Sequence, residues 1–279
     1  MIQLTQQQKE KLRAIRYLAL DMDGTIYLGS RLFPFTLGFL EDIGKAGIGH
    51  SFLTNNPTKS LDDYLGKLRK MGIDASPDQM YTTTIAMIDY IRSHYPDARR
   101  LFILGTPSMT SQFVRAGFEI VPADPDDIPD IVIGSFDMTL TYERLCHTAW
   151  LVSQGIPYLA TNPDRVCPTD QRTVLVDCGS ICKCIEHATG RKPDVTLGKP
   201  DPNMLLGIKE QHGLEASQVA MVGDRIYTDI EMAHNAGAFG VLVLSGETTI
   251  EVAKAAPKQP GLICRDIEEF GNLLEESRK

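Results

Sequence analysis

The chain has 279 residues, enough for one large or two medium domains. Apolar residues make up 43% and charged residues 23% of the sequence, proportions typical of a water-soluble globular protein. The net charge is −8 and no basic cluster is longer than a few residues, so a nucleic-acid polymer is not expected as a partner. No apolar run reaches the roughly 20 residues that a membrane-spanning helix needs, so we expect no membrane association.

The N-terminal segment and the cysteines indicate a cytoplasmic protein. Residues 1–20 place their charges before a short apolar run and lack a small-residue cleavage site, so no secretory signal is expected. A C-x₃-C-x-C cluster is formed by Cys178, Cys182 and Cys184. If residues 180–189 are helical, Cys182 and Cys184 point to different faces, which disfavours a shared zinc ion. We therefore expect free thiols, as in a reducing compartment.

Short apolar runs alternate with helical patterns from the N-terminus onward, as expected of an α/β protein with a largely parallel sheet. Ordered along the chain, the strands predicted outside the middle third are residues 17–20, 48–54, 195–197, 219–222 and 241–244. Helices are predicted from helical patterns that end at Gly72 and Gly237, at residues 60–71 and 230–236, and a final helix is predicted at residues 267–274. The sheet is therefore expected to draw strands from both ends of the chain.

The middle third repeats this alternation by itself. Strands are predicted at residues 101–104, 131–133 and 158–160, and helices at residues 108–116 and 142–153. A Pro- and Asp-rich stretch at residues 122–129 predicts a surface loop. About 100 residues form this stretch, a normal domain size, so we interpret it as an inserted α/β module.

Four polar motifs each follow a predicted strand. They are Asp21-x-Asp23-Gly24-Thr25, Thr54-Asn55-Asn56, Gly198-Lys199-Pro200 and Gly223-Asp224-Arg225-x-x-Thr228-Asp229. Because ligands bind outside the carboxyl ends of strands in open parallel sheets, the four motifs are expected to converge on one site. That site would gather several carboxylates, a lysine, threonines and glycine-flanked amides.

Such a site suits a cation and a phosphate group. Several carboxylates in one crevice would repel one another unless a cation neutralises them, and oxygen ligands favour Mg²⁺. Lys199 would add a second positive charge. Candidate donors to phosphate oxygens are Thr25, Thr54 and the amides of Asp23 and Gly24.

The paired carboxylates of the first motif suit the hydrolysis of a phosphate ester. Asp21 can attack phosphorus and form an acyl phosphate, and Asp23 can protonate the leaving alcohol and then deprotonate water. Asp-x-Asp-Gly alone is also a common turn or part of a calcium-binding EF-hand loop. That loop would need other residues at Ala19 and Ser30. Each remaining motif alone is commonly a helix cap, loop or turn, but their joint occurrence at strand ends favours a site.

The four motifs resemble those of the haloacid dehalogenase superfamily of phosphohydrolases. Further segments resemble the inserted cap of its NagD-like, or p-nitrophenylphosphatase-like, class IIA group: Leu104-Gly105, residues 130–134, Thr141-Tyr142, residues 160–164 and Cys178-Gly179-Ser180. The resemblance implies a Rossmann-like, haloacid dehalogenase-like core at residues 1–96 and 194–279. It also implies an α/β cap at residues 97–193, through which a homodimer can form.

The resemblance further implies a Mg²⁺-dependent phosphatase that acts on a small phosphorylated metabolite. Asp21 would be the nucleophile and Asp23 the general acid/base, with Thr54 holding phosphate and Lys199 bracing the nucleophile. Metal ligation would involve Asp21, the Asp23 carbonyl, Asp224 and, from a second layer, Asp229.

Candidate substrate contacts come from both parts of the chain. They are Gly24, Thr25, Asn55 and Asn56 in the core and Asn162, Asp164 and Arg165 in the cap. Many relatives carry Pro-Gly before the small-residue turn of the cap, where this chain has Asp177-Cys178-Gly179. The expected specificity loop, residues 164–178, contains Arg165, Cys167, Asp170 and Arg172.

The motifs do not select one substrate, and they suit esters of the nucleotide, sugar phosphate, pyridoxal phosphate and p-nitrophenyl phosphate types. A phosphomutase or other transferase on the same core is an alternative, as is an idle phosphate-binding sensor. A dehalogenase needs neither a proton donor nor Mg²⁺, so Asp23, Asp224 and Asp229 disfavour it.

Overall fold

The computed structural model describes residues 4–167 and 172–279, so Asp170 of the expected specificity loop lies outside the described residues. The described chain divides into two compact units. Unit 1 comprises the described residues up to Leu53 together with Leu65–Tyr81 and Lys199–Lys279. Unit 2 comprises the described part of Thr54–Tyr64 and Thr82–Gly198.

The limits of unit 2 differ from the cap limits expected from the sequence, residues 97–193. Helix α4 (Thr83–His94) belongs to unit 2, because it bonds to segments of that unit. The Thr83 hydroxyl donates to the carbonyl of Asn55 at 3.1 Å, and Arg92 donates to the carbonyl of Ala116 at 2.9 Å. The residues between α4 and the first strand of the unit therefore lie inside it.

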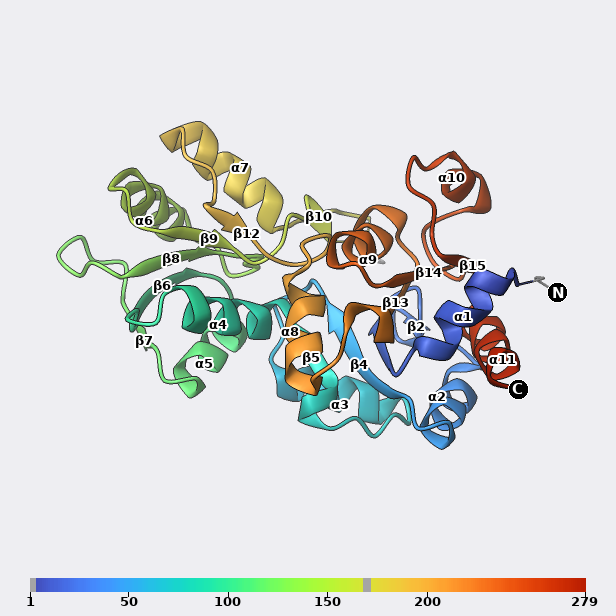
Figure 1. Cartoon of the computed structure of the whole chain (residues 1–279). Helices are drawn as coiled ribbons and strands as arrows, with labels where there is room; N and C mark the ends of the chain where they lie inside the picture. Colours follow the sequence, from blue (N-terminus) through green and yellow to red (C-terminus); the bar gives the residue numbers. More distant parts are fainter. Residues whose placement is uncertain (1–3, 168–171) are drawn as a thin grey trace. The chain divides into compact units, whose positions relative to one another are not determined.

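Unit 1 is built on a sheet of six strands in the order β15-β14-β13-β1-β4-β5 (Figure 1). The strands are β1 (Tyr17–Asp21), β4 (Gly49–Thr54), β5 (Met80–Thr82), β13 (Val219–Gly223), β14 (Phe239–Val243) and β15 (Leu262–Cys264). All five residues of β1 are buried, which explains its continuous apolar sequence. Strand β1 runs parallel to both β4 and β13, and Leu20 pairs with Val222. Asp21 and Gly223 therefore end adjacent parallel strands.

The helices of unit 1 form two groups. Helices α1 and α2 each pack against α11, and α9 packs on α8 and on β13 and β14 (Figure 1). Helix α3 (Leu61–Lys70) belongs in part to each unit. The remaining bounds are α1 (Gln6–Ala14), α2 (Thr36–Lys45), α8 (Asn203–His212), α9 (Glu231–Ala236), α10 (Ile250–Ala255), α11 (Ile267–Arg278) and the β2–β3 hairpin (Tyr27–Leu28, Arg31–Leu32).

Unit 2 is built on a five-stranded parallel sheet in the order β12-β9-β8-β6-β7. Helices α6 and α7 cover one face, and α4 and α5 lie on the other (Figure 1). The elements are β6 (Arg100–Leu104), α5 (Pro107–Arg115), β7 (Glu119–Ile120), β8 (Ile131–Gly134), α6 (Tyr142–Ser153), β9 (Tyr158–Ala160), β10 (Val166–Cys167), β11 (Leu175–Val176), α7 (Cys178–Thr189) and β12 (Val195–Thr196).

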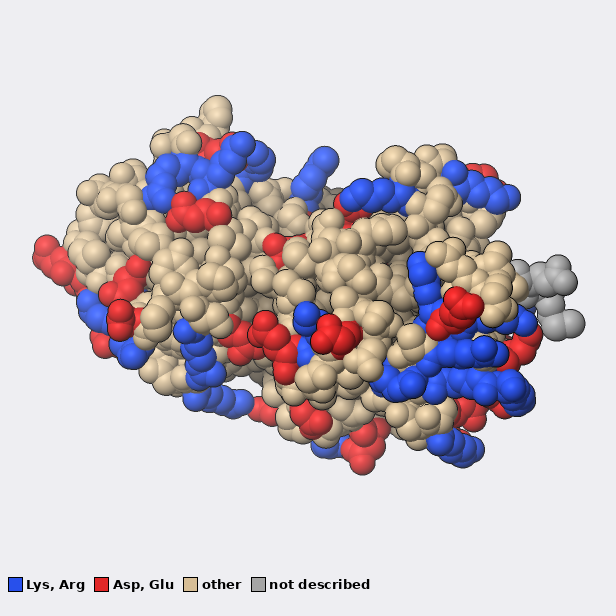
Figure 2. Space-filling view, viewed as in Figure 1, with Lys and Arg blue, Asp and Glu red and all other residues tan. Residues whose placement is uncertain are grey.

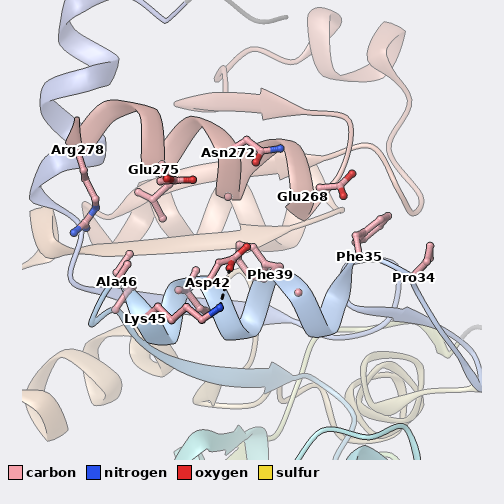
Figure 3. Close-up of a pocket in the computed structure, with 15 residues that line it drawn as sticks. Pro34, Phe35, Phe39, Asp42, Lys45, Ala46, Glu268, Asn272, Glu275 and Arg278 are labelled. Carbon is pink, nitrogen blue, oxygen red and sulfur yellow. Dashed lines mark ion pairs between the residues drawn. The ribbon is translucent and has the colours of Figure 1, made fainter.

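These two parallel sheets with helices confirm the predicted α/β class. Helix α7 buries Cys182 and exposes Cys184, so the predicted divergence of these thiols is confirmed. The six cysteines all lie in the described ranges, and none of them forms a disulfide. No helix in the described ranges has both the length and the apolar composition needed to cross a bilayer. Figure 2 shows Lys and Arg side chains interspersed with Asp and Glu over the face in view.

Candidate active site

A buried ion-pair network lies where β1 ends. Asp21 is the last residue of β1 and is 8% exposed, and Lys199 is 4% exposed. The Lys199 ammonium forms ion pairs with Asp21 Oδ1 and, at 2.7 Å, with Asp229 Oδ1. Burial acts to lower the pKa of Lys199, but the carboxylates of Asp21 and Asp229 outweigh it and raise this pKa. Lys199 therefore stays charged and holds one oxygen of the predicted nucleophile.

Three buried carboxylates form a candidate metal site in unit 1. Oxygens of Asp21, Asp224 and Asp229 lie within 4.8 Å of one another. Burial and the neighbouring carboxylates raise the pKa of Asp224 to about 7, whereas the rise for Asp229, to about 6, is opposed by Lys199. Asp224 Oδ1 is buried without a hydrogen-bond partner. A set of hard oxygen donors with one unsatisfied member fits a divalent cation such as Mg²⁺.

The loop after β1 brings its backbone against Asp224. The Met22 carbonyl accepts hydrogen bonds from the amides of Thr25 and Ile26, which closes a tight turn. Gly24 has φ +92°, and a Cβ atom there would lie 2.5 Å from Asp224 Oδ2, so only glycine fits. The Thr25 hydroxyl donates to Asp21 Oδ2 at 3.4 Å. The side chain of Asp23 is exposed, which leaves it accessible for proton transfer.

The fourth motif forms a π-helical turn, η3 (Ile226–Ile230), which carries Asp229. Asp229 is fully buried, and its Oδ2 accepts a hydrogen bond from the Arg225 amide at 3.0 Å. A Cβ atom on Gly223 would lie 2.3 Å from the Asp229 carboxyl carbon. The glycine before Asp224 therefore makes room for Asp229, and π-helical turns are frequent at functional sites.

The second motif lies at the start of unit 2. Thr54 Oγ1 accepts from the amide of Asn56 at 3.2 Å, and Asn56 Oδ1 accepts from the amide of Thr58 at 2.9 Å. The Asn55 side chain donates to Asp164 Oδ2 at 2.9 Å. These residues therefore form a polar turn, and helix α3 begins only at Leu61.

The cap residues predicted to contact substrate differ strongly in exposure. Asn162 is fully buried, and its amide donates to Asp164 at 3.1 Å and to Asp177 at 2.9 Å. Its oxygen accepts from the Thr161 hydroxyl at 2.8 Å, so the polar atoms of Asn162 are engaged within unit 2. Asp164 is half-buried, whereas Arg165 is exposed.

Asp177, the residue that departs from the usual cap sequence, has a structural role. It caps α7 by accepting from the Cys178 amide at 2.6 Å. Burial raises its pKa to about 6, although the bonds from Asn162 and Cys178 act in the opposite direction. This carboxyl therefore connects Asn162 to the helix N-terminus.

The candidate residues thus divide between the units. Unit 1 brings together Asp21, Asp23, Gly24, Thr25, Lys199, Asp224 and Asp229. Unit 2 contains Thr54, Asn55, Asn56, Asn162, Asp164 and Arg165. Sequence reasoning missed Glu247, whose amide donates to Asp224 Oδ2 at 2.6 Å. No motif signals this residue, because the bond comes from its backbone.

Comparison with known proteins agrees with this arrangement. Residues 18–119 match the model of the haloacid dehalogenase-like hydrolases, and residues 196–270 match a second model of the same kind of hydrolase. An acid sugar phosphatase of Staphylococcus aureus is 33% identical over 257 residues, covering 92% of this chain and 97% of the relative. The chain belongs to the haloacid dehalogenase-like hydrolases.

Similar solved structures indicate which group of these hydrolases the chain resembles. The 4-nitrophenylphosphatase of Thermotoga maritima has a TM-score of 0.88 and 38% identity, with 94% of this chain and 98% of that chain covered. NagD of Escherichia coli K-12 has a TM-score of 0.83 and 27% identity, with 91% and 98% covered. Within the family the chain is therefore a NagD-like phosphatase, a phosphoric monoester hydrolase.

Proposed function

We propose that the protein hydrolyses small organic phosphate monoesters with the help of Mg²⁺ and through a phospho-aspartate on Asp21. The observation that carries this proposal is the buried cluster of Asp21, Asp224 and Asp229, within 4.8 Å of one another. Lys199 is paired to two of these carboxylates, and Asp224 keeps an unpartnered oxygen. Most buried carboxylate oxygens in folded proteins have a partner, so the unpartnered oxygen of Asp224 supports a bound cation here.

The residues divide the chemistry into two steps. Asp21 attacks phosphorus, the bond from phosphorus to the ester oxygen breaks, and Asp23 gives its proton to the leaving alcohol. Asp23 then takes a proton from water, and the water oxygen attacks phosphorus. The acyl phosphate bond breaks, which restores the Asp21 carboxylate and releases inorganic phosphate.

The cation would be held by Asp21, the backbone carbonyl of Asp23 and Asp224. When bound, a divalent ion offsets the negative charge of the phosphate and of the clustered carboxylates. Asp229 is engaged by Lys199 and by the Arg225 amide, so its proposed part is to orient Lys199. Lys199 in turn holds Asp21 and supplies the second positive charge.

The substrates that we propose are sugar phosphates and other small monoesters, including p-nitrophenyl phosphate. The names of an acid sugar phosphatase and a 4-nitrophenylphosphatase among the relatives support this class. Thr54, Asn55 and Asn56 are proposed to hold phosphate and substrate, and Asp164 and Arg165 to contact the organic part. Asn162 is proposed to support Asp164, because its own polar atoms are engaged. Cysteines that form no disulfide in the described ranges are compatible with the cytoplasmic location that we propose.

The test is phosphate release from a panel of monoesters in Mg²⁺ and in EDTA, with Asp21→Asn as the matched variant. We expect the protein to release phosphate in Mg²⁺ but not in EDTA. We expect a folded Asp21→Asn protein to release none. Equal release in EDTA would contradict the role of the cation. Release by Asp21→Asn at the original rate would contradict the nucleophile. No release from any ester by the folded, Mg²⁺-loaded protein would favour a mutase or a sensor.

A further inference from the structure

A short segment after β14, Ser245–Thr248, lies directly on Asp224. The Glu247 amide donates to Asp224 Oδ2 at 2.6 Å, and the Thr248 amide donates to the Asp224 carbonyl at 3.2 Å. A Cβ atom on Gly246 would lie 2.0 Å from Asp224 Oδ2, so the backbone of the segment touches the carboxylate. We call Ser245–Thr248 the strap.

The strap is hydrogen-bonded to both loops that carry the candidate metal-site residues. The Ser245 hydroxyl donates to the carbonyl of Gly24 at 2.7 Å. The Ile226 amide donates to Thr248 Oγ1 at 3.2 Å. The loop after β1 and the π-helical turn are thereby tied to one segment, which belongs to no helix or strand.

The strap also forms contacts through a charged side chain, that of Glu247. The Glu247 carboxylate pairs with Arg225 Nε at 2.9 Å and accepts from the Tyr227 hydroxyl. Burial acts to lower the pKa of Arg225, but the carboxylates of Glu247 and Asp224 raise it, so this partner stays cationic. The side chain of Glu247 is 46% exposed and that of Arg225 is 27% exposed, so this pair is partly solvent-exposed, unlike the buried carboxylates of the candidate metal site.

These contacts make the two oxygens of Asp224 unequal. The Glu247 amide occupies Oδ2, whereas Oδ1 is buried without a partner. A carboxylate fixed by its surroundings loses less freedom when it binds a metal, and such outer partners strongly affect metal affinity. The position of the Glu247 amide depends in turn on how firmly the strap is held.

We infer that Glu247 and Arg225 are positioning residues, whose ion pair holds the strap so that Asp224 presents Oδ1 to the divalent cation. The inference rests on the proposed metal site. The simpler interpretation is an ordinary half-exposed ion pair, which contributes little to stability and has no effect on the cation. The two interpretations differ in cation affinity, which can be measured without substrate.

The experiment compares Glu247→Gln and Glu247→Ala with Glu231→Gln. Glu231 forms a similar half-exposed pair with Lys258 at 2.5 Å and serves as the matched control. Titration with Mn²⁺ followed by the EPR signal of the free ion gives the dissociation constant without turnover. We expect Glu247→Ala to weaken Mn²⁺ binding about tenfold and Glu247→Gln, which can still accept hydrogen bonds, to weaken it less. Glu231→Gln should bind Mn²⁺ like the unmodified protein.

Steady-state kinetics provide the second readout. We expect the Mn²⁺ concentration for half-maximal activity to rise with the dissociation constant, while KM for p-nitrophenyl phosphate at saturating Mn²⁺ changes little. Unchanged Mn²⁺ affinity in a folded, active Glu247→Ala protein would overturn the inference. So would a rise in KM alone, which would place Arg225 or Glu247 on the substrate. Failure of the proposed metal site would look different, because the unmodified protein itself would bind no Mn²⁺.

Discussion

Lys199 provides the sharpest test of how the carboxylate cluster is stabilised. Lys199 is 4% exposed, and its ammonium pairs with both Asp21 and Asp229, whose side chains are also largely buried. Replacing it as Lys199→Met removes the charge but keeps a side chain of similar length. The clustered carboxylates of Asp21, Asp224 and Asp229 then face one another without a cation.

The cost follows from burial. Removing one partner of a buried ion pair typically destabilises a protein by about 3–5 kcal/mol, whereas an exposed pair contributes about 0–1 kcal/mol. Lys258 pairs with Glu231 at side-chain exposures of 55% and 32%, so Lys258→Met is the matched control. In EDTA at pH 8 we expect Lys199→Met to lose about 3–5 kcal/mol of unfolding free energy and Lys258→Met at most about 1 kcal/mol.

A second substitution separates stability from activity. Adding Asp229→Asn to Lys199→Met removes one of the unpaired charges and should recover part of the lost stability. Activity should stay at least about 100-fold below that of the unmodified enzyme in both proteins, because the charge beside Asp21 is still missing. Urea unfolding and phosphate release measure the two effects. The reasoning would be refuted if Lys199→Met were as stable as Lys258→Met. It would also be refuted if the double variant were no more stable than Lys199→Met alone.

Three further predictions concern pH, backbone and metal. Burial raises the pKa of Asp177 to about 6, so the folded protein loses stability as pH rises from about 4 to above 6. Asp177→Asn keeps the helix cap, and its unfolding free energy should exceed that of the unmodified protein by about 2 kcal/mol at pH 8 but by little at pH 4. Urea unfolding measures this difference, and an equal gain at both pH values would contradict the prediction. Gly24→Ala should lower the unfolding free energy by about 1–3 kcal/mol and weaken Mn²⁺ binding. Gly29→Ala, at a residue with φ +61° and open space, should lower stability without changing Mn²⁺ binding, and equal Mn²⁺ affinities of the two variants would contradict this. Mg²⁺ at 100 times its Kd should raise the unfolding free energy by about 2.7 kcal/mol, and an equal rise in Asp224→Asn would argue against this ligand.

Much of the fold could be predicted because the strands are buried on both faces and therefore read as apolar runs. Strands β1, β8 and β9 and helix α6 lie where those runs and the helical spacing placed them. Helix α4 was not predicted, because its buried positions include Thr83, Thr84, Met87 and Ile88 and so give no clean apolar stripe. Its membership in unit 2 depends on contacts distant in sequence, which no local pattern contains.

The clustering of the candidate metal-site residues could be predicted for a similar reason. Parallel neighbours end at the same edge of a sheet, so Asp21 and Asp224 meet although about 200 residues separate them. Asn162 was a candidate substrate contact because residues 160–164 resemble the family's cap, and the structure shows that its hydrogen bonds are internal to unit 2. Glu247 was missed because its bond to Asp224 comes from the backbone, which is the same in every residue except proline.

The measurement that tests the central claim most directly is the trapping of the phosphoryl group during turnover. The enzyme is quenched with acid in the presence of Mg²⁺ and p-nitrophenyl phosphate, reduced with borohydride, digested and analysed by mass spectrometry. Because borohydride converts an aspartyl phosphate to homoserine, we predict homoserine at position 21, only in samples that received substrate, and none in Asp21→Asn. A reduced residue elsewhere in the chain, together with continued turnover by Asp21→Asn, would contradict the assignment of Asp21 as the nucleophile.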